Sequence, residues 1–264
     1  MVSAGQIVGR RSMEFRMQVK HFPTTVAAAY AVADRIAERL KATPKIVLGL
    51  ATGVTMEPVY ERLVALHRAG EISFANVTSF NLDEYVGLPP VDPRSYRSTM
   101  DSQLFDLVDI DKSRTFVPDG LVADPKAFGS RYEAMIREAG GIDLQLLGIG
   151  RNGHIGFNEP GADFAARTRV VDLEKSTLEA NSAFFGGALP PTQAMTMGIG
   201  TILDSREIIV LATGATKRDA VRASLLGDIT PDCPATALRR HPNVSWWLDA
   251  ESGAGVASGS LAAE

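Results

Sequence analysis

The order of apolar and polar positions near the start of the chain predicts two helices separated by a strand. Between residues 25 and 41, apolar side chains recur at spacings of three and four, the period of an amphipathic helix. The apolar run KIVLGLATG, residues 45–53, is too short for a helix and indicates a strand buried on both faces. Helical spacing resumes from residue 56 and ends at Gly70.

The same alternation continues to residue 249. Further strands are predicted at 76–82, 144–150, 207–214 and 244–249, and further helices at 128–141 and 216–227. Strands that alternate with helices form a mostly parallel sheet with helices on both faces, so the predicted fold class is α/β. Ligands of such sheets bind beyond the carboxyl ends of the strands, so the residues that follow each strand are the candidates for chemistry.

Composition narrows the class of protein. The chain has 264 residues, of which 45% are hydrophobic and 22% charged, as in average globular proteins. A net charge of −4 gives no sign of the basic surface that nucleic-acid binding usually needs. No apolar run reaches the ~18 residues that a membrane helix needs. We therefore expect neither a nucleic-acid nor a membrane partner, and a phosphate-bearing small molecule stays open as a ligand.

The chain is expected to form one α/β domain. Its predicted bounds are 15–250, preceded by a flexible leader at 1–14 and followed by a flexible tail at 251–264 that is rich in Gly, Ser and Ala. Cys233 is the only cysteine, so the chain has neither an internal disulfide nor a CxxC metal framework. This cysteine usage indicates the reducing cytoplasm.

One strand end places glycine and threonine before a helix. Thr52, Gly53, Val54 and Thr55 follow the strand at 45–53. Unpaired N–H groups and the dipole at a helix N-terminus attract anions, so this segment predicts a phosphate cradle. A glycine turn with a threonine cap is the alternative.

Lys217 stands in the first turn of the helix predicted at 216–227. A cation there opposes the helix dipole and is unfavourable unless an anion is bound, which points to a second phosphate contact. The alternative is a solvated lysine beside Arg218.

Two carboxylates, Asp83 and Glu84, lie side by side just past the strand at 76–82. Neighbouring residues on an extended chain point in opposite directions, so only one of the two carboxylates can face a given pocket. The alternative is a polar turn that leaves the strand.

The segment GIGRNGHIGFNEPG, residues 148–161, follows the apolar run 144–147 and carries His154 and Glu159 five residues apart. A loop can fold these two side chains together. Histidine titrates near neutral pH, and a carboxylate that orients or charges it makes a proton shuttle. The alternative is a histidine that is merely hydrogen-bonded within a glycine-rich loop.

Taken together and in this order, the segments LGLATGVT, FNLDEYVGLP, GIGRNGHIGFNEPG, RTRVVDLEKSTLEAN and AMTMGIGTILDSREIIVLATGATK resemble the glucosamine-6-phosphate deaminase (isomerase) family. The resemblance runs from about residue 46 to residue 249. It implies a modified Rossmann-like α/β fold with a lid at about 161–187. It also implies a deaminase-type hydrolase that needs no metal and no cofactor, and that turns an amino-sugar phosphate into fructose 6-phosphate and ammonia.

The resemblance also implies roles for individual residues. The histidine and glutamate of GHIGFNEP, here His154 and Glu159, move a proton onto the ring oxygen when the sugar ring opens. The aspartate of DEYVG, here Asp83, takes the C2 proton on the way to an enediol-type intermediate. The phosphate is held by the loop Thr52–Thr55 and by Lys217.

The chain departs from the family pattern next to the histidine. Where some members carry an aspartate two residues before it, this chain has Asn152, as other members do. An asparagine can orient His154 but holds no negative charge, so we expect Glu159 to supply the charge.

Two more departures from the family pattern concern residues that would bind the phosphate. The TGGT loop of the family reads TGVT here, and Val54 disfavours a positive φ. The lid motif NxRFF has Ala183 in place of its arginine. Either another cation compensates, with Arg167 and Arg218 as candidates, or the preferred substrate differs in its phosphate or its stereochemistry.

Several alternatives stay open at the level of sequence. The same chemistry on galactosamine 6-phosphate or on an unphosphorylated amino sugar is one, and lactone hydrolysis or a sugar-phosphate-binding regulator are others. Some family members are activated by N-acetylglucosamine 6-phosphate through a basic pair, of which this chain keeps Arg169 but has Val171 as the second member. We expect weak or absent activation. A homo-oligomer is possible.

Overall fold

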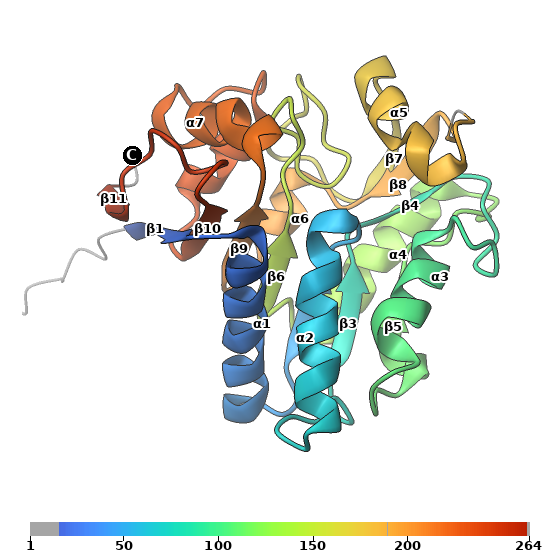
Figure 1. Cartoon of the computed structure of the whole chain (residues 1–264). Helices are drawn as coiled ribbons and strands as arrows, with labels where there is room; N and C mark the ends of the chain where they lie inside the picture. The colour runs from blue at the N-terminus through green and yellow to red at the C-terminus, as the bar shows by residue number, and fades with distance from the viewer. Residues whose placement is uncertain (1–15, 189, 263–264) are drawn as a thin grey trace, which may run out of the picture.

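The computed structural model describes residues 16–188 and 190–262, so the predicted leader 1–14 lies outside the described residues. Its centre is an eight-stranded sheet in which seven strands are parallel and the edge strand β11 is antiparallel to its neighbour (Figure 1). In spatial order the strands are β11 (Gly259–Ala262), β1 (Arg16–Phe22), β10 (Val244–Asp249), β9 (Ile208–Ala212), β6 (Leu144–Leu147), β2 (Val47–Leu50), β3 (Thr78–Asn81) and β5 (Thr115–Phe116).

Helices connect the strands and cover the sheet. They are α1 (Thr25–Ala42), α2 (Glu57–Arg68), α3 (Tyr96–Met100), α4 (Pro125–Glu138), α5 (Lys175–Asn181), α6 (Ile199–Leu203) and α7 (Arg218–Leu226). Figure 1 shows α1 and α2 side by side in front of the sheet. The α4 helix packs on β3, where Tyr132 meets Phe80 edge to face with the ring centres 5.6 Å apart. The predicted α/β class with a mostly parallel sheet is confirmed.

The direction in which the chain crosses the sheet changes between β2 and β6. From β2 the chain proceeds through β3 to β5, whereas from β6 it proceeds the other way, through β9 to β10. Right-handed crossovers in opposite directions put their helices on opposite faces and open a crevice between the two strands. The loops that follow β2 and β6 border this crevice, as the sequence analysis expects for a ligand site.

A second, antiparallel sheet lies beside the main one. It consists of β4 (Asp83–Tyr85), β8 (Gln193–Thr196) and β7 (Arg169–Asp172) in that order. The sequence analysis does not predict it, because its strands are only three or four residues long and lack a clear period of two. A small aromatic and aliphatic cluster covers it, in which Tyr85 meets Phe157 and Phe185 with ring centres 5.4 and 5.1 Å apart.

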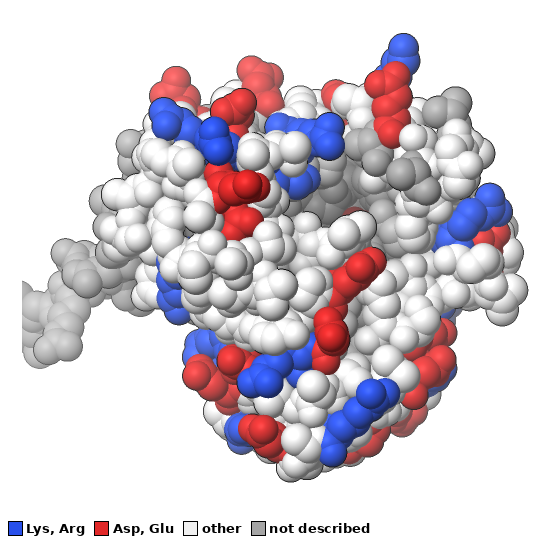
Figure 2. All heavy atoms as spheres, viewed as in Figure 1, with Lys and Arg blue, Asp and Glu red and all other residues white. Residues whose placement is uncertain are grey.

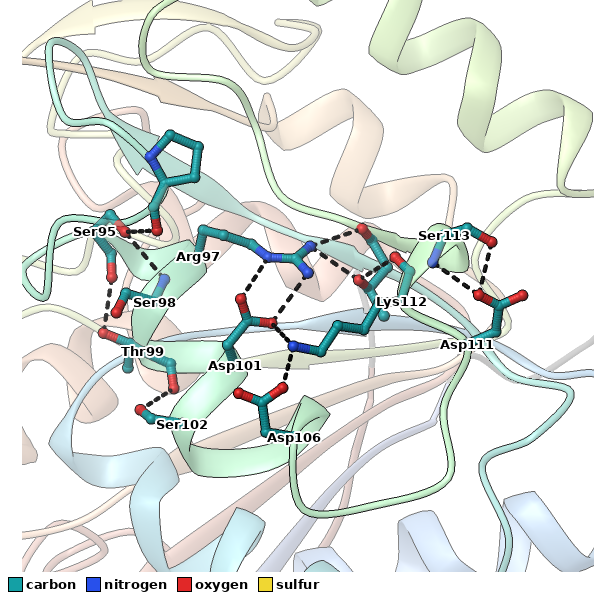
Figure 3. Close-up of polar contacts among 12 residues, drawn as sticks. Ser95, Arg97, Ser98, Thr99, Asp101, Ser102, Asp106, Asp111, Lys112 and Ser113 are labelled. Atoms are coloured by element: carbon teal, nitrogen blue, oxygen red, sulfur yellow. Dashed lines mark hydrogen bonds and ion pairs between the residues drawn. The ribbon is translucent and has the colours of Figure 1, made fainter.

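A polar network fixes α3 (Figure 3). Arg97 donates to the carbonyl and hydroxyl oxygens of Thr115, at 3.1 and 2.9 Å, and pairs with Asp101 at 3.0 Å. Lys112 bridges Asp101 and Asp106. These contacts tie α3 to the start of β5, so the N-terminus of α3 is held in a fixed place against β4.

The expectation of a flexible tail from residue 251 is wrong for the residues that the structure describes. Ser252 is fully buried and donates to the carbonyl of Ala212 at 2.7 Å, and Val256 is 7% exposed in the main core. The segment then ends in β11, which pairs antiparallel with β1. Its small residues suggested fraying, but small residues also allow close packing against a sheet.

We expect a chain that ends at Gly255 to lose at least about 2 kcal/mol of unfolding free energy, because it gives up the burial of Val256 and the β11 ladder. Chemical denaturation of the shortened and full-length proteins measures this difference. Equal midpoints would contradict a packed C-terminus.

Candidate active site

The loop after β6 is shaped to bring His154 close to its own backbone. A Cβ on Gly150 would lie 2.3–2.4 Å from the imidazole ring of His154, so only glycine fits there. The loop is held from outside by two backbone bonds, from Ala235 N–H to the Gly153 carbonyl at 2.9 Å and from Gly161 N–H to the Pro231 carbonyl at 2.8 Å. The histidine therefore sits on a fixed loop.

The structure brings His154 and Glu159 together, as predicted. His154 Nδ1 lies 3.3 Å from Glu159 Oε2, a close contact without hydrogen-bond geometry. Nε2 has no hydrogen-bond partner in the described part of the chain either. Thr177 Oγ1, on α5, donates to Glu159 Oε1 at 2.5 Å. The glutamate thus contacts both the histidine and the predicted lid.

Asn152 acts differently from what the sequence analysis expects. Its Nδ2 donates to Glu159 Oε2 at 2.8 Å, and its Oδ1 accepts from the backbone N–H of His154 at 3.2 Å. No hydrogen bond joins it to the imidazole ring. Asn152 therefore holds the carboxylate and the loop, and it reaches His154 only through them.

Glu159 is held in its charged form. Burial acts to raise its pKa, but the nearby His154 imidazole, together with hydrogen bonds from Thr177 and Asn152, outweighs burial and leaves the pKa below its ordinary value. The carboxylate can therefore carry the charge that we expected of it.

Asp83 and Glu84 point in opposite directions, which confirms that only one carboxylate of the pair faces the cavity. Glu84 accepts hydrogen bonds from the backbone N–H groups of Tyr85, Tyr96 and Arg97 at 2.9–3.0 Å, and so binds the N-terminus of α3. Asp83 lines the cavity instead. Its carboxylate has no hydrogen-bond donor among the residues that the structure describes.

This environment makes Asp83 an unusual carboxyl group. It is 7% exposed, and burial, with a smaller contribution from the charge of Glu84, raises its pKa to about 8. Such a group gives up its proton only near or above neutral pH and then accepts a proton readily, which suits a general base.

The loop after β2 offers free backbone donors. Gly53 takes the positive φ of 123° that the loop needs, and Val54 follows in a one-turn 3-10 helix, Val54–Met56, with an ordinary negative φ. The concern that Val54 strains the loop is therefore removed. The N–H groups of Gly53 and Val54, and the hydroxyls of Thr52 and Thr55, have no partner within the described residues, and all four residues line the cavity.

Two cations face the cavity beside this loop. Lys217 and Arg151 both line it, and neither is paired with a carboxylate within the described residues. Burial, and next the charge of Arg151, lower the pKa of Lys217, so the two cations lie near enough to repel each other. An anion bound between them would relieve this repulsion.

The two cations named as candidates to compensate for Ala183, Arg167 and Arg218, do not line the cavity. Arg167 pairs with Glu133 and Asp204 at 2.8 and 2.7 Å, and Arg218 donates to the carbonyl of Glu251 at 3.1 Å. The side chain of Ala183 itself lies outside what the structure describes. Sequence reasoning missed Arg151 because it treated GIGRNGH as a support for His154 alone.

These groups share one cavity of about 800 Å³ at the β2–β6 crevice. Eight of the nine predicted site residues line it, and Glu159 adjoins it through His154. Figure 2 shows a hollow on this side of the molecule with Lys and Arg atoms at its rim. The α5 segment contributes Ser176, Thr177 and Asn181 to the wall, so the predicted lid stands over the site.

We expect Asp83→Asn to melt at a higher temperature than the wild type, by a margin that grows as the pH rises from 5 and levels off above about 8. The pKa of Asp83 is about 8 in the folded protein and about 4 when unfolded, so the folded state binds more protons in this range and loses stability as pH rises. Asparagine cannot ionise. Thermal melts across pH measure the margin.

Glu133→Gln is the matched control with the opposite sign. Burial acts to raise the pKa of Glu133, but hydrogen bonds from Thr168 and Thr201 and the charge of Arg167 lower it overall, so its loss should destabilise the protein at neutral pH. A margin for Asp83→Asn that does not change with pH would contradict the buried-base assignment.

Comparisons with known proteins agree with this geometry. A family model described as glucosamine-6-phosphate isomerases/6-phosphogluconolactonase matches residues 23–246. A relative from Shewanella loihica, named glucosamine-6-phosphate deaminase, is 51% identical over 88% of this chain and 87% of its own length. One of the same name from Bacillus velezensis is 48% identical over 84% of this chain and 93% of its own.

Solved structures show the same likeness. A structure described as a monomeric glucosamine-6-phosphate deaminase has a TM-score of 0.87 and 44% identity, over 90% of this chain and 99% of that one. A 6-phosphogluconolactonase from Trypanosoma brucei, with a TM-score of 0.71 and 22% identity over 92% of this chain and 100% of that one, shares the fold. The chain therefore belongs to the glucosamine-6-phosphate isomerase and 6-phosphogluconolactonase family, and within it to the glucosamine-6-phosphate deaminases.

Proposed function

We propose that the protein converts glucosamine 6-phosphate and one water into fructose 6-phosphate and ammonia, through ring opening and an enediol-type intermediate. The observation that carries this proposal is the Asp83 carboxylate, which faces the cavity, lacks a donor among the described residues and has a pKa of about 8. Isomerisation requires a base for the C2 proton. Lactone hydrolysis requires none, so Asp83 favours the deaminase reaction.

The remaining residues fit the other steps of the reaction. His154, beside the Glu159 carboxylate, would carry a proton to the ring oxygen through Nε2, and Asn152 and Thr177 would keep Glu159 in place. Because Thr177 lies on α5, the segment that walls the cavity also holds the carboxylate of the proton shuttle. This gives the lid a chemical role as well as a shielding one.

Two cations and a loop would bind the phosphate. The N–H groups of Gly53 and Val54 and the hydroxyls of Thr52 and Thr55 would donate to its oxygens, and Lys217 and Arg151 would supply positive charge. Arg151 would replace the lid arginine that this chain lacks at Ala183. A phosphorylated substrate is therefore favoured over an unphosphorylated amino sugar.

The proposal also covers the cellular compartment and the oligomeric state of the protein. None of the helices within the described residues is long and apolar enough to cross a membrane. We place the reaction in the cytoplasm, where the single Cys233 stays reduced. Sedimentation of the purified protein measures whether it self-associates.

The direct test incubates purified protein with glucosamine 6-phosphate and measures ammonia and fructose 6-phosphate. Equal amounts of both products are expected, with much lower rates from galactosamine 6-phosphate and glucosamine. The rate constant kcat/KM should rise with pH and level off above about 8, because only the ionised Asp83 accepts the C2 proton.

Binding of fructose 6-phosphate, which has no amine and needs no base, is the control for the pH profile. Absence of ammonia from every amino sugar would overturn the proposed function. A rate that is already maximal at pH 6 would instead overturn Asp83 as the base.

We expect Arg151→Ala to raise KM for glucosamine 6-phosphate about tenfold, since a charge-assisted phosphate contact contributes roughly 1.5–3 kcal/mol. Its kcat should stay within about threefold, because the phosphate is remote from the bonds that change. Arg218→Ala is the matched control: Arg218 is a neighbouring exposed arginine that does not line the cavity. If both variants kept the wild-type KM, Arg151 would not be a phosphate ligand.

A further inference from the structure

The chain contains two loops of the same build. LATGVT at 50–55 follows β2, and LATGAT at 211–216 follows β9, so the two loops stand on either side of β6. Each has a glycine with positive φ, 123° at Gly53 and 85° at Gly214, then a one-turn 3-10 helix, then an α-helix. The sequence of the second loop predicts no role for it beyond carrying Lys217.

The two loops differ in what their N–H groups bind. In the second loop, Gly214 N–H donates to Asp249 Oδ2 at 2.9 Å and Ala215 N–H donates to Glu251 Oε2 at 3.1 Å. The equivalent N–H groups of Gly53 and Val54 have no acceptor within the described residues. Carboxylates of the chain itself thus occupy one loop, and the other is open to a bound anion.

Asp249 joins three segments at the end of β10. Besides Gly214, its Oδ2 accepts from Thr25 Oγ1 at 2.8 Å, and its Oδ1 accepts from the Ser252 N–H at 2.8 Å. The residue is 3% exposed. Its carboxylate therefore ties the loop after β9 to the first turn of α1 and to the turn after β10.

Lys217 depends on the start of this loop. The 3-10 turn Ala215–Lys217 begins after Gly214 and is closed by the Lys217 N–H, which donates to the Gly214 carbonyl at 3.1 Å. Holding Gly214 thus fixes the turn from which Lys217 enters the cavity. We propose that Asp249 is a positioning residue, which through Gly214 aims Lys217 at the anion site.

The negative charge of Asp249 and its hold on the Gly214 turn predict opposite effects on phosphate binding. Burial acts to raise its pKa, but hydrogen bonds from Ser252, Thr25 and Gly214 lower it overall, so the group is negative at neutral pH. A negative charge near an anion site weakens binding by itself. Removal of that charge should tighten phosphate binding if Asp249 acts only through the field, and weaken it if Asp249 holds the turn.

The test measures the Kd of inorganic phosphate by calorimetry in Asp249→Asn. Oδ2 accepts from Gly214 and Thr25, and Oδ1 accepts from Ser252. An amide either turns its NH₂ group toward Gly214 and Thr25 or offers them a neutral oxygen that is a weaker acceptor, so the hold on Gly214 weakens in both orientations. We expect Kd to rise about tenfold, the effect of one misplaced cationic contact. Glu133→Gln, at a buried carboxylate that does not line the cavity, should leave Kd unchanged.

A second pair of variants shows whether the effect passes through Lys217. In a Lys217→Met background, Asp249→Asn should change Kd by less than about twofold, because the contact it positions is already gone. Thr25→Val removes one donor to the same oxygen and keeps the charge, so it should weaken phosphate binding about two- to threefold. It also serves as the test if Asp249→Asn does not fold.

The outcomes distinguish the positioning role of Asp249 from the deaminase reaction. The positioning role rests on the proposed function for Lys217 as a phosphate ligand and for the identity of the substrate. Unchanged or tighter phosphate binding in folded Asp249→Asn, no effect of Thr25→Val, or an undiminished effect in the Lys217→Met background would overturn the positioning role. So would a wild type that does not bind phosphate. Failure to release ammonia would overturn the deaminase reaction and leave the phosphate titration to decide on Asp249.

Discussion

Asp83 lies where the chain leaves β3 of the main sheet and begins β4 of the small one, and this change of sheet takes its carboxylate out of water. Glu84, the next residue, turns the other way and takes up the free N–H groups of α3. Glu84 stabilises the fold through these hydrogen bonds, and Asp83 is left without a donor among the described residues. The site depends on this difference, because a donor close to Asp83 would lower its pKa and weaken it as a base.

The cavity separates its charges. The charge that acts on Asp83 is that of Glu84, whereas the charge that acts on Lys217 is that of Arg151. No ion pair among the described residues joins either cation to Asp83 or Glu159. A substrate with a phosphate at one end and reacting carbons at the other would be oriented by this separation before any chemistry occurs. The same separation keeps the cations from pairing with the catalytic carboxylates, which would lower the pKa of Asp83 and occupy the anion site.

Much of the architecture follows from local patterns. The helices at 25–42 and 57–68 and the strands at 47–50 and 244–249 are marked by apolar periodicity, and the crevice at their carboxyl ends follows from the parallel sheet. The small antiparallel sheet could not be predicted in this way, because its strands are short and β4 pairs with β8 across more than a hundred residues. The packed C-terminal segment was missed for a related reason, since β11 is specified by its partner β1 rather than by its own composition.

Which atoms a site residue contacts was harder to predict than which residues belong to the site. Asp83, His154 and Lys217 were found from their places after strands, but Asn152 was assigned to the wrong partner, because a loop sequence does not say which atoms its fold brings together. Arg151 and Asp249 were missed for another reason. The sequence alone does not show that a cation lines a ligand cavity, or that a carboxylate holds a loop in place.

The state of the Asp83 carboxyl group tests this account most directly. A carbon-13 NMR titration of protein labelled at aspartate, with the Asp83 signal assigned by its loss in Asp83→Asn, reports the pKa of that group without any substrate. The account predicts a midpoint near pH 8. A midpoint near the ordinary aspartate value of about 4 would contradict it.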